Sequence, residues 1–118
     1  MNRLIGAAAT FYGGLGAVAL LRPETIPATF GGTATTPDSR TEVRAVYGGL
    51  PLAIAAALVV RPETAGTMGV LTAGMAAGRA ASALAERRTT AVTPVFVAVE
   101  AVVAAALFAG ARRLATPR

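Results

Sequence analysis

Five ionisable or phenolic side chains stand within otherwise apolar stretches of this sequence. Glu42, Arg44 and Tyr47 open one apolar segment, and Arg79 and Glu100 each lie well inside a later one. An ionised side chain near the centre of a bilayer costs at least ~2.5–3.5 kcal/mol on insertion scales. We therefore expect Glu100 to face inward and either to pair with Arg79 or Arg44 or to stay protonated.

A carboxyl group near guanidinium and phenol groups is suited to acid–base chemistry. Glu100 would give or take the proton, while Arg79 and Arg44 would set its charge or hold an anion. Tyr47 would donate a hydrogen bond to an apolar substrate undergoing isomerisation, cyclisation or epoxide opening. The hypothetical catalytic residues are Glu100, Arg79, Arg44 and Tyr47, and the hypothetical ligand contacts are Glu42, Ser82 and Tyr12.

Simpler explanations of the same residues stay open, so the sequence does not decide whether this protein is an enzyme. An Arg79–Glu100 pair also explains how Ala-rich helices hold one register. Glu42 is equally explained as a helix cap, because Ser39 and Glu42 have capping-box spacing. The alternative to a site for a lipophilic small molecule is a non-enzymatic membrane component: a transporter subunit, a lipid binder or an oligomeric accessory protein.

The composition favours a membrane protein and excludes several kinds of chemistry. Of 118 residues, 54% are hydrophobic and only 14% are charged, whereas an ordinary soluble domain has about 25% charged residues. A soluble helical bundle is disfavoured because its outward faces would be apolar. Without Cys or His, thiol chemistry and the commonest metal ligands are absent. No phosphate-binding or dinucleotide motif is present, so we expect no metal and no soluble cofactor.

The basic residues lie where a membrane protein meets lipid headgroups. The net charge is +5 and every basic residue is Arg. These arginines stand at segment ends rather than in one patch, with no stacking aromatics among them, which argues against nucleic-acid binding. The Ala-rich, Arg-only composition is typical of bacterial proteins. The expected location is integral to the membrane, in the bacterial inner (cytoplasmic) membrane.

Four apolar segments have about the length of membrane-spanning helices, since ~20 helical residues cross ~30 Å of hydrocarbon. They predict an all-α, four-helix transmembrane bundle with up-down-up-down topology, both termini on the same side, and a single domain over 1–118. A signal peptide is the competing explanation of the first segment, but that segment ends at Arg22-Pro23-Glu24 rather than at a small-residue cleavage site. The predicted spans are 4–21, 40–60, 65–85 and 91–111.

Alternating spans place the polar groups in the same half of the bilayer. At 1.5 Å per residue, Arg79 lies ~9 Å and Glu100 ~14 Å from the third loop. Tyr47 lies near the first loop, which is on that same side, and Tyr12 reaches a similar depth from it. We therefore expect these side chains to face one another across neighbouring helices.

Two backbone features predict irregular or close helix packing. Pro51 has no N–H, so the carbonyl of Tyr47 loses its usual helical partner and needs another one in lipid. Gly74 and Gly78 form a small-xxx-small pair, which lets a second helix approach closely and favours a homo-oligomer.

One motif resembles a known family. Glu42-Val43-Arg44-Ala45-Val46-Tyr47-Gly48-Gly49, followed by Gly78-Arg79-x-x-Ser82 and a lone Glu100, is similar to a family of small bacterial four-helix membrane proteins known only as a domain of unknown function. The resemblance covers nearly the whole chain. It implies four spans and a shared polar cluster but no particular reaction. The family usually has Asn in place of Thr41 and Asp in place of Glu86.

Overall fold

The chain folds into helices only. The computed structural model describes residues 2–116, and every regular element in that range is helical, which confirms the predicted all-α class. Each predicted segment coincides with a long helix or with a continuous run of helices. In chain order the elements are α1 (Arg3–Leu21), α2 (Thr25–Thr29), α3 (Pro37–Val43), the π-helical η1 (Arg44–Gly49), α4 (Leu50–Val60), the 3-10 turn η2 (Pro62–Thr64), α5 (Ala65–Glu86) and α6 (Val92–Ala115).

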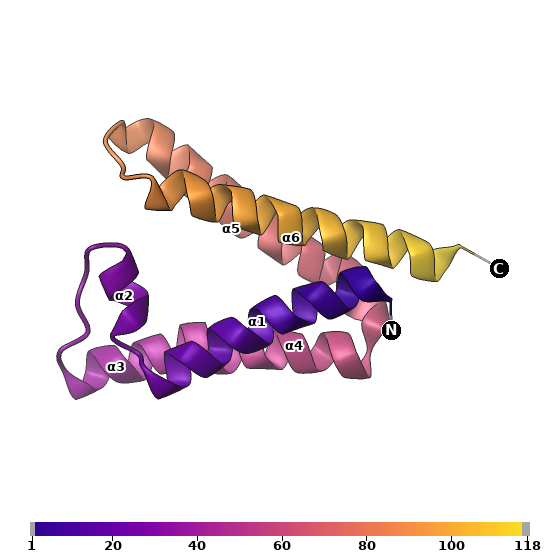
Figure 1. The fold of residues 1–118 in the computed structure, drawn as a ribbon, viewed down its shortest axis with the longest axis horizontal. Helices are drawn as coiled ribbons and strands as arrows, with labels where there is room; N and C mark the ends of the chain where they lie inside the picture. The colour runs from indigo at the N-terminus through magenta and orange to yellow at the C-terminus, as the bar shows by residue number, and fades with distance from the viewer. Residues whose placement is uncertain (1, 117–118) are drawn as a thin grey trace.

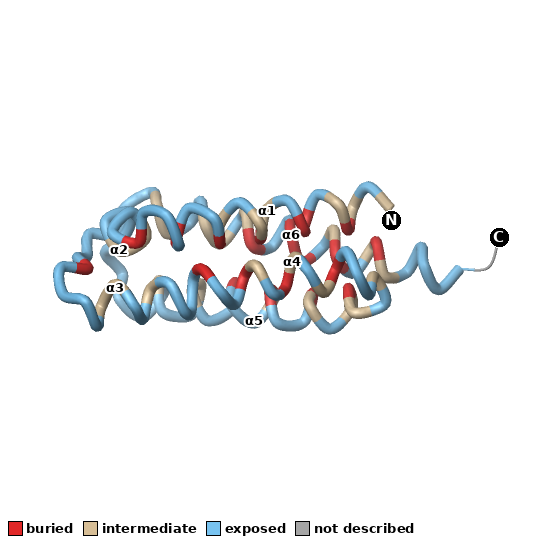
Figure 2. The backbone as a smooth tube through the Cα atoms, turned by 90° about the horizontal axis from the view of Figure 1, so that it is seen from below, coloured by how far each residue is buried: buried red, intermediate tan, exposed pale blue. Residues whose placement is uncertain are grey.

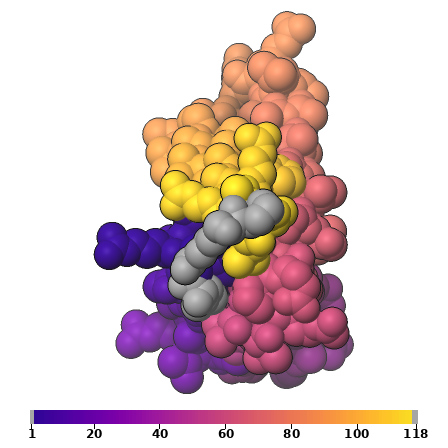
Figure 3. Space-filling view, turned by 90° about the vertical axis from the view of Figure 1, so that its right-hand side faces the viewer, coloured from indigo at the N-terminus to yellow at the C-terminus, as the bar shows by residue number. Residues whose placement is uncertain are grey.

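The long helices lie in two pairs, as Figure 1 shows. α1 packs beside the continuous run of α3, η1 and α4, and α5 packs beside α6. The pairs approach each other where α1 begins and α6 ends, and they diverge toward the opposite end, where α2 lies (Figure 1). Figure 3 looks onto the end where the pairs meet, with the indigo start of α1 beside the yellow end of α6.

A single side chain ties the beginning of α1 to α6. The Asn2 carboxamide oxygen accepts the N–H of Ile5 at 2.9 Å and so caps α1. The Asn2 carboxamide nitrogen donates to the carbonyl oxygen of Gly110 at 3.1 Å. Cap residues of this type satisfy one of the N–H groups that a helix start leaves unpaired. The cap therefore also fixes where α1 crosses α6.

The second long helix begins earlier than predicted, and Glu42 does not cap it. Thr36 and Ser39 form the capping box: the Ser39 N–H donates to Thr36 Oγ1 and the Thr36 N–H donates to Ser39 Oγ, each at 3.0 Å. Pro37 occupies the first turn, where its fixed φ suits a helix start. The prediction that Glu42 reaches back to the cap is wrong, because the helix has already formed before that residue and leaves Glu42 exposed.

The last helix extends beyond its predicted end. α6 continues to Ala115, and Arg112 and Arg113 form part of its final turn instead of ending it. Cations are favourable there because the last carbonyls of a helix carry partial negative charge.

A wider helical turn precedes Pro51. Within η1 the N–H of Leu50 donates to the carbonyl of Ala45, five residues earlier. A π-helical turn of this kind is uncommon and changes which way the following side chains point. The irregularity that Pro51 predicts therefore takes the form of η1, while α3, η1 and α4 remain one continuous helix of 24 residues over Pro37–Val60.

Glycine allows α1 to approach η1 closely. A Cβ atom added at Gly16 would lie 2.8 Å from the carbonyl oxygen of Gly48 and 2.6 Å from Cγ of Leu52. One added at Gly48 would lie 2.8 Å from Leu20 side-chain atoms. Neither position has room for a side chain, so this contact requires small residues on both helices.

The outer faces of the helices are apolar and exposed. Figure 2 shows buried residues along the inner faces and exposed residues around the outside. Leu21, Val60 and Leu84 are 81%, 76% and 79% exposed, which is unusual for soluble proteins when such residues are contiguous. Among the described residues three helices are long and apolar enough to cross a membrane, namely Arg3–Leu21, Pro37–Val60 and Val92–Ala115. This is consistent with an integral membrane protein.

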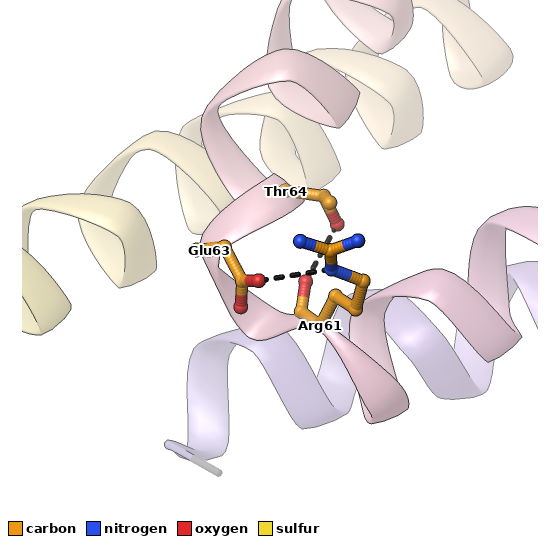
Figure 4. Close-up of polar contacts among 3 residues, drawn as sticks. All are labelled: Arg61, Glu63 and Thr64. Carbon is orange, nitrogen blue, oxygen red and sulfur yellow. Dashed lines mark hydrogen bonds and ion pairs between the residues drawn. The ribbon is translucent and has the colours of Figure 1, made fainter.

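The turn between α4 and α5 carries an exposed ion pair, drawn in Figure 4. The Arg61 Nε donates to Glu63 Oε1 at 3.1 Å, and the Thr64 hydroxyl donates to the Arg61 carbonyl at 2.8 Å. The Glu63 backbone N–H and the Arg61 guanidinium lower the pKa of the Glu63 carboxyl, because both favour its charged form. Both side chains are largely exposed, so solvent screens this pair.

The close contact at Gly16 can be tested with a glycine in the same helix as control. We expect Gly16→Ala to lower the free energy of unfolding by about 1–3 kcal/mol, because the backbone of Gly48 must move. Gly14→Ala should be neutral or stabilising by about 0.5–1 kcal/mol, since nothing lies within 4 Å of its added Cβ. Unfolding in detergent micelles measures both, and equal effects would contradict the close approach of α1 and η1.

Candidate functional site

A partly open cavity of about 190 Å³ lies among α1, α2, the η1–α4 segment, α5 and α6. Its walls are mainly aliphatic and aromatic. Arg79 and Glu100 are the only charged residues that line it, and Tyr12, Tyr47 and Thr29 are the other polar ones. Concave, mostly apolar sites with a few convergent polar groups are the usual form of small-molecule sites.

The two charged residues meet at the cavity wall. Arg79 Nε donates to Glu100 Oε1 at 2.7 Å, and Arg79 Nη2 donates to Glu100 Oε2 at 3.4 Å. The Glu100 side chain is 5% exposed and that of Arg79 is 27% exposed. The contact expected between α5 and α6 is therefore present, and it is two-pronged, the geometry in which a guanidinium binds a carboxylate best. Each charge compensates the other in a place where water is scarce.

Two phenylalanines support the guanidinium from other elements. The Arg79 guanidinium carbon lies 5.1 Å from the ring centre of Phe30 and 5.5 Å from that of Phe96. The two rings lie 5.0 Å apart, so the three groups form a nearly equilateral triangle. Cation–π contacts of this kind are worth ~0.5–2 kcal/mol. Phe30 follows α2 and Phe96 lies on α6, so Arg79 joins three elements at once.

Sequence reasoning missed these aromatic residues as parts of the site. The sequence feature that could have identified them is the small number of aromatic residues. The chain has only 4 phenylalanines, and three of them line the cavity, namely Phe11, Phe30 and Phe96. Phe30 lies in the connection that Pro and Gly residues interrupt, and no periodicity predicts where such a connection folds back.

Tyr12 lines the cavity from α1 and is buried. Its hydroxyl bonds to the hydroxyl of Thr72 on α5, and the Thr72 hydroxyl donates to the carbonyl of Met68 at 2.8 Å. Because a threonine hydroxyl has one hydrogen, Tyr12 is the donor to Thr72. Thr72 was not among the predicted residues. Helical spacing could have identified it, because Thr72 precedes Arg79 by two turns and lies on the same face of α5.

Arg44 and Tyr47 do not work on the same site, contrary to expectation. Tyr47 lines the cavity, whereas Arg44 Nε donates to the carbonyl of Leu20 at 3.2 Å and so satisfies one of the last carbonyls of α1. Both residues lie in η1. The residues of a π-helical turn do not follow the 3.6-residue repeat that would place positions three apart on one face.

Glu42 and Ser82 do not line the cavity. Both are exposed. Ser82 borders an open surface hollow that shares Tyr47 and Arg79 with the cavity wall, whereas Glu42 borders neither that hollow nor the cavity. Of the seven residues predicted for the site, the structure gathers Tyr12, Tyr47, Arg79 and Glu100 around one cavity and separates Arg44, Glu42 and Ser82 from it.

Over residues 2–116 there is no group of three or more His, Cys, Asp or Glu side chains that could hold a metal ion. The polar groups available at the cavity are thus one ion pair and hydroxyl groups. With those groups a ligand can be oriented by hydrogen bonds and can exchange a proton with a carboxylate.

Membrane-length apolar helices and a cavity walled by a buried ion pair define a class of small helical protein suited to a lipid environment. Residues 1–111 match the model of a family described as a domain of unknown function, DUF4345. The chain therefore belongs to this family, in agreement with the resemblance seen in its motifs. No curated protein and no solved structure matches the chain.

The ion pair should behave unlike the exposed pair of Figure 4. Arg79→Gln should lower the free energy of unfolding by about 3–5 kcal/mol, because it leaves the Glu100 carboxylate buried without a partner. Glu100→Gln should lower it by less, because the Arg79 side chain is 27% exposed. The double variant Arg79→Gln/Glu100→Gln should lose less than the sum of the two. As the matched control, Glu63→Gln should leave unfolding unchanged within error, since its partner Arg61 is 72% exposed. Additive effects at Arg79 and Glu100 would contradict their pairing.

Proposed function

We propose that this protein is a small integral membrane protein that binds a lipophilic small molecule in the cavity beside Arg79 and Glu100. In this proposal four helices span the bacterial inner membrane in an up-down-up-down bundle, with both termini on the same side. The observation that carries the proposal is the pairing itself: a carboxylate and a guanidinium meet at the wall of a mainly apolar cavity.

The cavity is what distinguishes a binding site from a structural ion pair. A pair that only held α5 to α6 would be expected to sit in a filled interior, because protein cores are close-packed and voids remove contacts. Here about 190 Å³ lies against the charged wall. An engineered apolar cavity of about 150 Å³ is enough to bind a benzene molecule. The volume therefore suits a ligand slightly larger than a single ring.

The lipid-facing exterior favours a ligand that reaches the protein through the membrane. All the long helices carry exposed large apolar side chains, which lipid rather than water would surround. A molecule dissolved in the bilayer reaches such a cavity without crossing water. This supports a lipophilic ligand and a site inside the membrane.

Glu100 also supports a second candidate function, cofactor-independent acid–base catalysis. It is the only buried carboxyl group among the described residues, and it lines the cavity. A carboxyl group in reach of an apolar substrate can transfer a proton. Isomerisation, cyclisation and epoxide opening are the reactions that need no further group. The non-enzymatic alternative, a lipid binder or accessory component, uses the same cavity without turnover.

The four-span proposal depends on α5, which is long enough to cross but is diluted by Gly, Thr, Ser and charged residues. The chain has no Cys, so single cysteines report topology directly. We expect Thr33→Cys and Thr90→Cys to react with an impermeant maleimide from one side of the membrane, and Glu63→Cys from the other. All three positions are exposed. If Glu63→Cys and Thr90→Cys react from the same side, α5 does not cross and the four-span bundle is wrong.

Binding can be tested by photolabelling in vesicles with a ten-carbon alkyl alcohol that carries a diazirine. We expect labelling of cavity residues that excess unlabelled 1-decanol suppresses. Ile54→Phe, which places a larger side chain against the cavity from α4, should weaken this saturable component. Val102→Phe introduces the same phenyl ring on the exposed face of α6 and should not. Mass spectrometry locates the label. Labelling that is never saturable, or that stays unchanged in Ile54→Phe and in a second variant of this kind, Met75→Phe, would exclude a binding cavity.

A further inference from the structure

The cavity wall carries no net charge. Arg79 and Glu100 are its only charged residues, and each is the other's partner. A ligand carboxylate would compete with Glu100 for the guanidinium, and its success would leave Glu100 buried without a partner. A ligand ammonium would compete with Arg79 in the same way. Unpaired buried charges are strongly unfavourable, so the site disfavours ligands of either charge.

The wall offers more hydrogen-bond donors than acceptors. A guanidinium has five N–H groups, and Arg79 uses the one on Nε and one of the two on Nη2 for Glu100. No acceptor for Nη1 and no partner for the Tyr47 hydroxyl is found in the part of the chain that the structure describes. Both Glu100 oxygens already accept an Arg79 N–H. A ligand therefore finds donors free and the main acceptor engaged.

Phe30 and Phe96 restrict how a ligand can meet these donors. Both rings lie about 5 Å from the guanidinium carbon and line the same cavity. Because the two rings lie only 5.0 Å apart, they crowd the same side of the guanidinium, where cations and rings attract. A ligand oxygen must therefore reach the free N–H groups from another side.

From this charge balance, donor excess and size we infer the class of ligand. It is an uncharged lipophile of about ten carbon atoms, with a hydrogen-bond acceptor oxygen such as a ketone, ether or epoxide. The oxygen accepts a hydrogen bond from Arg79, assisted by Tyr47, and the carbon skeleton fills the apolar part of the cavity. This inference rests on the proposed binding function and adds the chemistry of the ligand.

The inferred ligand class can be tested with compounds that share one carbon skeleton but differ in their functional group and charge. The probes are menthane, menthone, menthylamine and menthane carboxylate, each used to compete with the diazirine alcohol in vesicles. Concentrations are measured in the lipid phase, so that partitioning does not mimic affinity. We expect menthone to compete about tenfold better than menthane, the ratio typical of one hydrogen bond to a charged donor. The amine and the carboxylate should compete no better than menthane.

Variants test whether Arg79 and Tyr47 cause the preference for menthone over menthane. Arg79→Gln/Glu100→Gln, which keeps the wall neutral, should reduce the menthone-to-menthane ratio to about one while menthane still competes. Tyr47→Phe should reduce it by a smaller factor and guards against misfolding of the double variant. Arg44→Gln removes a guanidinium outside the cavity and should leave the ratio unchanged.

The results of these experiments distinguish an error in the inferred ligand class from an error in the proposed binding function. If the carboxylate or the amine competes best, or if menthone and menthane compete equally, the inferred ligand class is wrong although the cavity still binds lipophiles. If no compound competes and labelling is never saturable, the proposed binding function itself fails.

Discussion

A charge in an apolar interior must be compensated, and this constraint shapes the protein more than any other. Glu100 is buried on α6, and within residues 2–116 the only guanidinium that reaches it comes from Arg79 on α5. That single contact sets the rotation of both helices about their axes, because each side chain must point at the other. It also draws Phe30 across from α2, so that an otherwise irregular connection closes over the cavity.

Away from this pair the protein combines an apolar core, which includes Ile5, Leu58 and Leu107, with small residues and backbone contacts. The closest approach of α1 to η1 needs Gly16 and Gly48, and α1 is joined to α5 through Tyr12 and Thr72. In lipid, where apolar burial does not distinguish helix from solvent, close packing and hydrogen bonds hold helices together. The cavity beside the pair is notable in this setting, since nothing in helix packing alone requires it.

The parts of the site that sequence reasoning predicted are those governed by the cost of burying charge. Arg79 and Glu100 could be paired before any coordinates, because an unpaired partner in either helix would be unfavourable. Arg44 could not be placed, since its direction depends on the π-helical turn, and Pro51 predicts an irregularity there without predicting its form. Glu42 was misassigned because Thr36 and Ser39 offered an equally good capping box one turn earlier. The folding back of α2 depends on tertiary contacts with Phe96.

The turn η1 has a consequence for how this sequence can change. A π-helical turn is what one surplus residue produces in an α-helix, and it offsets everything before it by about 100° relative to everything after it. Losing one codon between positions 44 and 49 would restore regular winding while keeping the reading frame. The part of the helix that contains α3 would then rotate about the helix axis relative to α4. The side chain of Tyr47 would then leave the cavity, although the overall helical content would barely change.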